Sequence, residues 1–86
     1  MRNDNYGAVV TVRLNSVDKV REFVIKASKF DSEVDGIRGR YICDAKSILS
    51  ILAFDLNQSL DVGIISDDKE EIERFKEEMK ELECSD

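Results

Sequence analysis

The sequence predicts an α+β fold of the open-faced sandwich type, in which a four-stranded, mostly antiparallel sheet carries three helices on one face. Two patterns support this prediction. Apolar and polar residues alternate in segments typical of half-buried strands, and apolar residues recur every three to four positions in segments typical of amphipathic helices. The segments follow in the order β-α-β-β-α-β-α, and a helix with an apolar stripe must bury it against a sheet or another helix.

The first strand and the first helix are predicted within residues 6–30. The strand is expected at residues 6–14, where YGAVVTVRL alternates apolar and polar side chains. Ser16 can cap the helix that follows, because its hydroxyl can accept a hydrogen bond from a free backbone N–H. Glu22 and Lys26 are expected to pair on the solvent side of this helix. Its apolar stripe consists of Val17, Val20, Phe23, Val24 and Ala27.

The middle of the chain predicts a β-hairpin followed by a short helix. Residues 31–37 and 40–43 are expected as two short strands. Gly39 permits the tight turn between them, because glycine tolerates backbone conformations that other residues avoid. Ser47 is then expected to cap a short helix at about residues 48–53.

The last strand and the last helix are predicted from two further patterns. Leu60, Val62 and Ile64 alternate along the chain and indicate a fourth strand. Asp67 and Glu70 have the spacing of a capping box for the final helix. The apolar stripe with which this helix should pack on the sheet consists of Ile72, Phe75, Met79 and Leu82.

Length and charge narrow the possible functions. The 86 residues, with a formal net charge of −6, are expected to form a single domain, 1–86. Residues 67–83 hold nine acidic and four basic residues, so most of the negative charge lies on the final helix. This balance argues against nucleic-acid binding, which needs a basic face.

Membrane, export and metal signals are also missing from the sequence. No apolar run reaches the roughly 18–20 residues of a membrane span, and the first residues do not have the pattern of a signal peptide. We therefore expect a cytoplasmic protein without membrane insertion, in which Cys43 and Cys84 are reduced thiols. Cys43 is expected to be a small core residue. Two cysteines without histidine are too few for a zinc site, and neither a metal nor a cofactor is expected.

The composition gives little support to catalysis. The chain contains no histidine, so it cannot form a Ser–His–Asp triad. It also has no glycine-rich phosphate-binding loop. Without a pairing of a nucleophile and a base, the protein is expected not to be an enzyme.

Four stretches of sequence carry a resemblance to a known family. They are VREFVIKASKF at residues 20–30, FDSEV at 30–34, DAKSIL at 44–49 and LNQS at 56–59. Through them, residues 10–82 resemble HPr, the small phosphocarrier protein of the bacterial sugar phosphotransferase system. The resemblance implies the same fold as the one predicted from the patterns above.

The resemblance also places a degenerate phosphoacceptor position at Ser16. HPr proteins carry a phosphoryl group on a histidine that opens the first helix, followed by an arginine and a proline. These positions fall here at Ser16, Asp18 and Lys19. A serine phosphate is a stable ester that would not pass its phosphoryl group on, and Asp18 would repel an incoming phosphoryl group. A plain helix cap is the alternative role for Ser16.

A second implied site lies at the start of the second helix. In many Gram-positive HPr proteins a kinase phosphorylates the serine found here as Ser47, and Lys46 beside it could pair with the phosphate. A plain cap is again the alternative. The helix is crowded with apolar residues, which belong either to the core or to an exposed docking patch. The expected partner-binding residues are Lys46, Ile48, Leu49, Ile51 and Leu52.

The sequence therefore predicts a non-catalytic, HPr-like protein without phosphocarrier activity. Its expected role is that of a binding or regulatory partner in sugar phosphotransferase or carbon-catabolite control. The expected partners are phosphotransferase-system enzymes, a kinase or a transcriptional regulator. The alternative is a structural or accessory interaction protein unrelated to sugar transport.

Overall fold

The computed structural model describes residues 6–83, so Cys84 lies outside the described part of the chain. The order of elements is β-α-β-β-α-β-α, as predicted, and a short 3-10 helix follows. The strands are β1 (Ala8–Arg13), β2 (Glu33–Arg38), β3 (Tyr41–Asp44) and β4 (Ser59–Ile65). The helices are α1 (Val17–Ala27), α2 (Ile48–Leu52), α3 (Lys69–Met79) and η1 (Lys80–Leu82).

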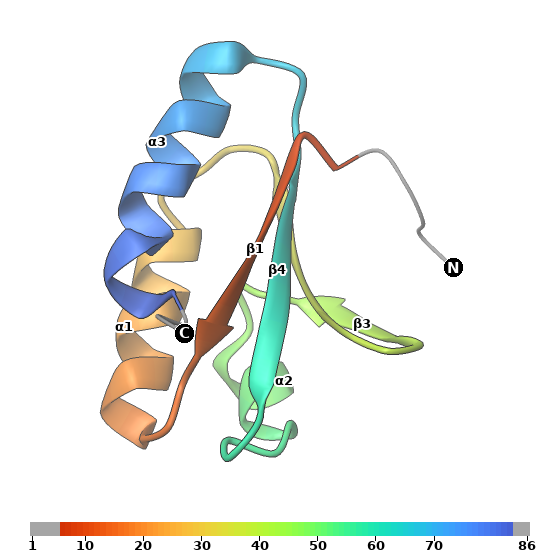
Figure 1. Cartoon of the computed structure of the whole chain (residues 1–86), viewed down its shortest axis with the longest axis vertical. Helices are drawn as coiled ribbons and strands as arrows, with labels where there is room; N and C mark the ends of the chain where they lie inside the picture. Colours follow the sequence, from red (N-terminus) through yellow and green to blue (C-terminus); the bar gives the residue numbers. More distant parts are fainter. Residues whose placement is uncertain (1–5, 84–86) are drawn as a thin grey trace.

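The four strands form one sheet in the order β1-β4-β2-β3, and every pairing is antiparallel. β4 lies inside the sheet, between β1 and β2, whereas β3 lies at one edge and pairs with β2. Figure 1 shows β1 and β4 side by side, with β3 on the side away from α1 and α3. The predicted fold class is therefore confirmed.

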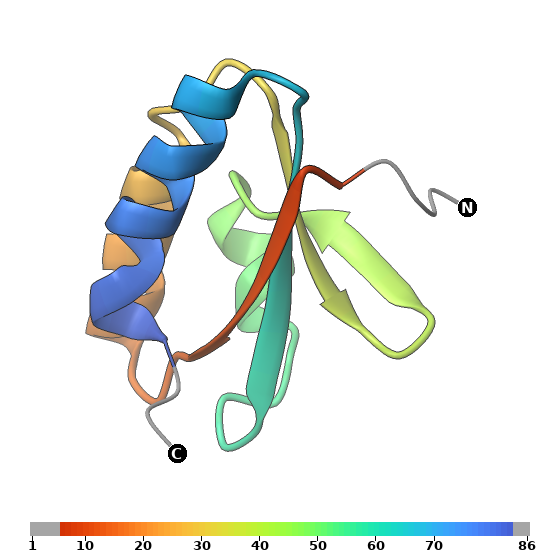
Figure 2. The same ribbon diagram turned by 45° about the horizontal axis from the view of Figure 1, so that its top comes forward.

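The helices cover one face of this sheet. α1 contacts both α2 and α3, while α3 contacts β1 and α2 contacts β3. Figure 2 shows the helices on one side and the hairpin of β2 and β3 projecting away from α1 and α3. The largest side chains that are fully buried between the layers are Phe23, Phe75, Ile51, Ile64, Met79, Val12, Val20, Val34 and Val62.

The apolar stripe of α3 and η1 is confirmed for three of its four residues. The buried members are Phe75, Met79 and Leu82. The ring of Phe75 meets the ring of Phe30 edge to face, with 5.9 Å between their centroids. Ile72, the fourth residue, is only half-buried. Near the N-terminal end of α3, the buried residue is Glu71.

Glu71 is a buried carboxylate that the apolar pattern does not indicate. Its oxygens accept hydrogen bonds from the Ser32 hydroxyl at 2.6 Å, the Ser66 hydroxyl at 2.7 Å and the Ser32 backbone N–H at 3.3 Å. These donors, the Ser32 hydroxyl foremost, hold the pKa of Glu71 below its ordinary value. The contacts fix the start of α3 to the connection that precedes β2.

α3 begins one residue later than predicted. Asp68 is its N-cap, and Oδ1 of Asp68 accepts the N–H of Glu70 at 3.0 Å. The Ser66 hydroxyl accepts the N–H of Asp68 at 3.1 Å and helps to hold the residues before the helix. The predicted capping box of Asp67 and Glu70 is therefore wrong, because Ser66 and Asp68 provide the hydrogen bonds at this helix start.

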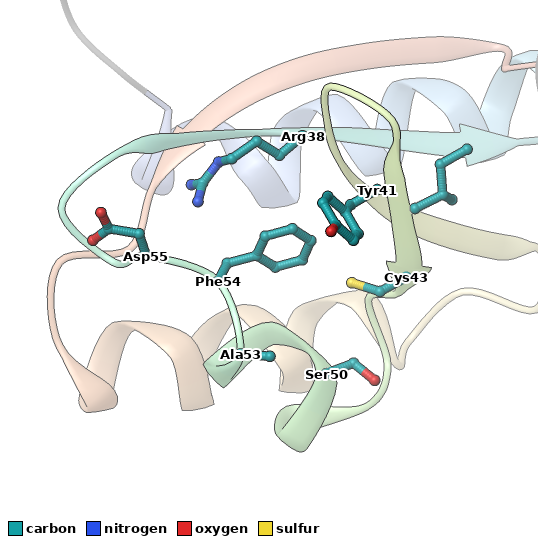
Figure 3. A pocket seen from close by; sticks show the side chains of 8 residues that line it. Arg38, Tyr41, Cys43, Ser50, Ala53, Phe54 and Asp55 are labelled. Carbon is teal, nitrogen blue, oxygen red and sulfur yellow. The ribbon is translucent and has the colours of Figure 1, made fainter.

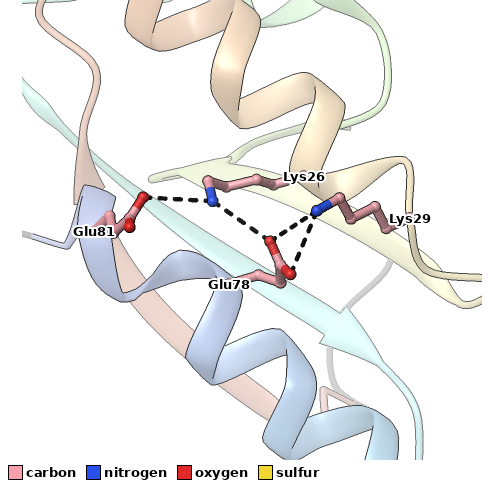
Figure 4. Close-up of polar contacts among 4 residues, drawn as sticks. All are labelled: Lys26, Lys29, Glu78 and Glu81. Carbon is pink, nitrogen blue, oxygen red and sulfur yellow. Dashed lines mark hydrogen bonds and ion pairs between the residues drawn. The ribbon is translucent and has the colours of Figure 1, made fainter.

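Lys26, expected to pair with Glu22 in solvent, points toward α3. Its Nζ lies 3.4 Å from Glu78 Oε1 and 3.6 Å from Glu81 Oε1. Nζ of Lys29 lies 3.3 Å from the same Glu78 oxygen (Figure 4). Burial alone would raise the pKa of Glu78, but the two lysines outweigh it and lower this pKa. The ion pairs join the end of α1 and Lys29, just after it, to the end of α3 and to η1.

A tight turn at Gly39 joins β2 to β3, as predicted, and its two residues are Gly39 and Arg40. Gly39 has a φ of 60°, a left-handed value that glycine adopts without the steric penalty of a side chain. Arg38 and Tyr41 are directly opposite each other at the start of the hairpin. Because opposite residues of paired strands share a face, the turn places both side chains on the same side of the sheet.

Candidate functional site

Ser16 lies exposed at the start of α1, where it is the predicted N-cap. Its hydroxyl oxygen accepts the backbone N–H of Lys19 at 3.2 Å. Asp18 is exposed in the first turn of the helix. The hydroxyl thus has a structural role, and a carboxylate two residues away disfavours a further negative charge.

Ser47 caps α2, as predicted, because its hydroxyl oxygen accepts the N–H of Ser50 at 3.4 Å. The preceding turn is fixed by Asp44, whose carboxylate accepts the N–H of Lys46 at 2.9 Å and whose carbonyl accepts the N–H of Ser47 at 3.1 Å. The ammonium group of Lys46 donates to the carbonyl of Phe30 at 2.6 Å. Lys46 therefore fixes this turn to the segment before β2.

The apolar side chains of α2 divide between core and solvent. Ile51 is 0% exposed, so its predicted place in a partner-binding surface is wrong. It faces Gly36 of β2, where a Cβ atom would lie 3.2 Å from Cδ1 of Ile51. Ile48 is half-buried against the core. In contrast, Leu49 is 78% exposed and Leu52 is 37% exposed.

We name the exposed side of this helix, formed by Leu49 and Leu52, the α2 surface. Single exposed apolar residues are common on soluble proteins and need no explanation. Here, however, four of the six large apolar side chains that are exposed in the described part of the chain belong to two helices in contact, α1 and α2. These four are Val17, Ile25, Leu49 and Leu52. Leu49 and Leu52, three positions apart on the short α2, lie on one side of this helix and are the exposed apolar pair on which an interaction surface there would depend.

A pocket of about 560 Å³ lies between β3 and the C-terminal end of α2. Figure 3 shows the side chains from the hairpin facing those from α2 and the residues after it. The residues that carry its chemistry are Arg38, Tyr41, Cys43, Ser50, Phe54 and Asp55. Most of its surface is apolar, and Arg38 and Asp55 contribute one cationic and one anionic side chain.

Arg38 is held in this pocket by one aromatic ring and three hydrogen bonds. Its guanidinium carbon lies 5.1 Å from the centroid of the Phe54 ring, in a cation–π contact. Nε and Nη2 donate to the carbonyl of Ser59 at 3.2 and 2.8 Å, and Nη2 also donates to the carbonyl of Gln58 at 3.1 Å. The head group is therefore fixed on both the ring and the start of β4.

Cys43, predicted as a small core residue, is only half-buried: it packs against the edge of the core and lines the pocket. Burial, together with the nearby Asp35 and Asp44 carboxylates, raises the pKa of its thiol, although a hydrogen bond from the Gly36 backbone works in the opposite direction. The thiol therefore stays protonated at neutral pH and is a poor nucleophile.

Sequence reasoning missed this pocket. Its walls come from the hairpin and from the end of α2, and only the fold brings these two segments together. One signal was available: the hairpin turn carries Arg38, Arg40 and Tyr41 without an acidic residue, in a chain whose net charge is −6. Of these three residues, Arg38 and Tyr41 line the pocket, so the composition of the turn marks one of its walls.

Among the described residues, neither a metal-binding group nor a membrane-spanning helix is found. Within residues 6–83, no group of three or more His, Cys, Asp or Glu side chains could hold a metal ion. In the same range, no helix is both long and apolar enough to cross a membrane.

Comparison with known proteins places the fold. No protein-family model matches the sequence, and no curated protein does. Among solved structures, the crystal structure of HPr-C-His from Thermoanaerobacter tengcongensis is similar, with a TM-score of 0.64 and 21% sequence identity. The match covers 85% of this chain and 91% of that chain. At this identity the likeness concerns the fold, and the fold is that of an HPr.

Proposed function

We propose that this protein is an HPr-like binding or regulatory partner, without phosphocarrier activity, in sugar phosphotransferase or carbon-catabolite control. The observation that carries the proposal is a chain with the HPr fold and no histidine. A phosphoryl relay on an imidazole is impossible without one. The proposal includes a single domain, 1–86, and a cytoplasmic location, both of which the sequence predicts.

The residues at the start of α1 support the proposal that the protein does not transfer phosphoryl groups. Ser16 stands where the resemblance places the phosphoacceptor, and its hydroxyl already accepts a hydrogen bond from Lys19. Asp18, exposed in the same turn, repels an incoming phosphoryl group. A phosphate formed on Ser16 would also be a stable ester rather than a transferable group.

The α2 surface is the part of the molecule through which the protein would bind its partner. Leu49 is 78% exposed, and a bound protein that covered it would remove this side chain from water. Burying a leucine side chain lowers the free energy by roughly 1.5–3 kcal/mol. Ser47 borders this surface, so a phosphate on it would add nearly two negative charges beside Leu49. Phosphorylation of Ser47 is therefore proposed to regulate binding, not to support transfer.

Binding to purified components tests this proposal. The protein is titrated against the phosphoenolpyruvate-dependent first enzyme, an HPr-directed kinase and a sugar-responsive transcriptional regulator. We expect at least one complex, weakened about tenfold or more by Leu49→Glu, because the new charge must lose its water on binding. Val9→Glu is the matched control, since Val9 is 51% exposed on β1, far from α2 in the sheet order.

Two results would count against the proposed role. If none of the three proteins binds, the alternative of an accessory protein unrelated to sugar transport is favoured. If a complex forms but Leu49→Glu and Val9→Glu weaken it equally, the α2 surface is not the docking site.

A further inference from the structure

The pocket between β3 and α2 carries two opposite charges that do not pair with each other. Arg38 and Asp55 both line it, yet no ion pair joins them within the described chain. Each is instead held by neutral groups of the loop before β4. Figure 3 shows both head groups toward one end of the pocket and Tyr41 and Cys43 toward the other.

Both charged groups keep hydrogen-bonding capacity. The three hydrogen bonds of Arg38 use the N–H groups of Nε and Nη2, so the N–H groups of Nη1 remain available. Asp55 accepts one bond at Oδ1 from the N–H of Asn57 and one at Oδ2 from the side chain of Gln58. An ionised carboxylate can accept further bonds at both oxygens.

The remaining walls are apolar and aromatic. Phe54 forms one wall, and the ring of Tyr41 stands at the mouth with 76% of the residue exposed. The volume of about 560 Å³ lies within the roughly 300–1,000 Å³ of small-molecule sites, which combine apolar walls with a few polar groups that orient the ligand.

We propose that this pocket binds a free α-amino acid with an aromatic or other large apolar side chain. Its carboxylate would accept from Nη1 of Arg38, and its ammonium group would donate to Asp55. Its side chain would lie against Phe54 and Tyr41. A zwitterion fits because each of its charges then meets a side chain of opposite charge, whereas a ligand with only one charge leaves either Arg38 or Asp55 without a charged partner. This inference is independent of the proposed function.

A ligand series on the unaltered protein gives the first test. L-tryptophan is a suitable probe, because the chain contains no tryptophan and the fluorescence anisotropy of the ligand is then read without background. Indole-3-propionate lacks the ammonium group and tryptamine lacks the carboxylate. We expect L-tryptophan to bind at least about tenfold more tightly than either. No binding of L-tryptophan, or equal binding of all three, would overturn the proposal.

Variants then assign each charge. Arg38→Gln should weaken L-tryptophan about tenfold or more and leave tryptamine unchanged, whereas Asp55→Asn should weaken L-tryptophan and leave indole-3-propionate unchanged. Arg40→Gln is the matched control, because Arg40 is exposed in the same turn and does not line the pocket. If Arg40→Gln weakens L-tryptophan as much as Arg38→Gln does, the pocket is not the binding site. Melting curves establish that each variant is folded, and the ligand series decides the matter if Arg38→Gln is not.

Discussion

Phe75 and Glu77 lie two residues apart on α3 and give the clearest contrast between core and surface. Phe75 is fully buried, so Phe75→Ala should lower the free energy of unfolding by about 3–5 kcal/mol. The Glu77 side chain is exposed and lies 4.0 Å from Lys80, so Glu77→Ala should cost under about 0.5 kcal/mol. Urea melts measure both. Equal losses of unfolding free energy would contradict the orientation of α3, in which Phe75 faces the sheet and Glu77 faces solvent.

Glu71 should make stability depend on pH in the acid range. Its folded-state pKa lies below the ordinary value, so its stabilisation is present above the pKa of the unfolded chain and is lost as pH falls through the folded-state pKa. Glu71→Gln should therefore lower the urea midpoint at neutral pH. The gap to the unaltered protein should narrow below about pH 4, near the ordinary glutamate pKa. A difference in urea midpoint that stays constant with pH would contradict the claim that the ionised Glu71 carboxylate stabilises the fold.

Whether the sequence predicts the role of a single residue depends on how far along the chain its interaction partner lies. Ser16 and Ser47 were predicted as caps because a cap bonds to a residue three positions away. The partners of Lys26 and Glu71 lie across the fold, Lys26 and Glu78 being 52 positions apart, and no local pattern contains that information.

At the scale of elements, α2 shows why the buried and exposed residues of a short helix are hard to tell apart from sequence. Its five residues include four large apolar side chains, and periodicity over little more than one turn cannot tell which of them face the sheet. Gly36 has no side chain, and Ile51 fills the space that this leaves, whereas Leu49 faces solvent. Only the folded structure, in which Gly36 of β2 lies under α2, shows which of the two is buried.

Substitutions in α2 test this division. Ile51→Ala should cost about 2–5 kcal/mol because it opens a cavity, whereas Leu49→Ala should cost under about 0.5 kcal/mol. Ser47→Asp keeps an N-cap acceptor and should change stability by less than about 1 kcal/mol. Thermal melts of the three variants check the ranking. A Leu49→Ala loss as large as that of Ile51→Ala would place Leu49 in the core and remove the α2 surface.

At the scale of the whole molecule, the order of elements was predictable because each strand and long helix carries its own pattern. The antiparallel sheet follows from that order, and the match to an HPr structure agrees with it. The pocket was not predictable, because Arg38 and Asp55 come together only through the packing of the hairpin against α2. Surfaces built from distant segments are determined by tertiary structure, which local periodicity does not describe.

The measurement that tests the central proposal most directly is phosphoryl transfer. The protein is incubated with the first enzyme of the phosphotransferase system and labelled phosphoenolpyruvate, with a histidine-bearing HPr as the positive control. Ser16→His is a second sample, and it should restore little transfer because Asp18 still repels the phosphoryl group. We expect label on the control HPr and none on this protein. Stable or transferable label on the unaltered chain would contradict the proposal that it is a binding protein without phosphocarrier activity.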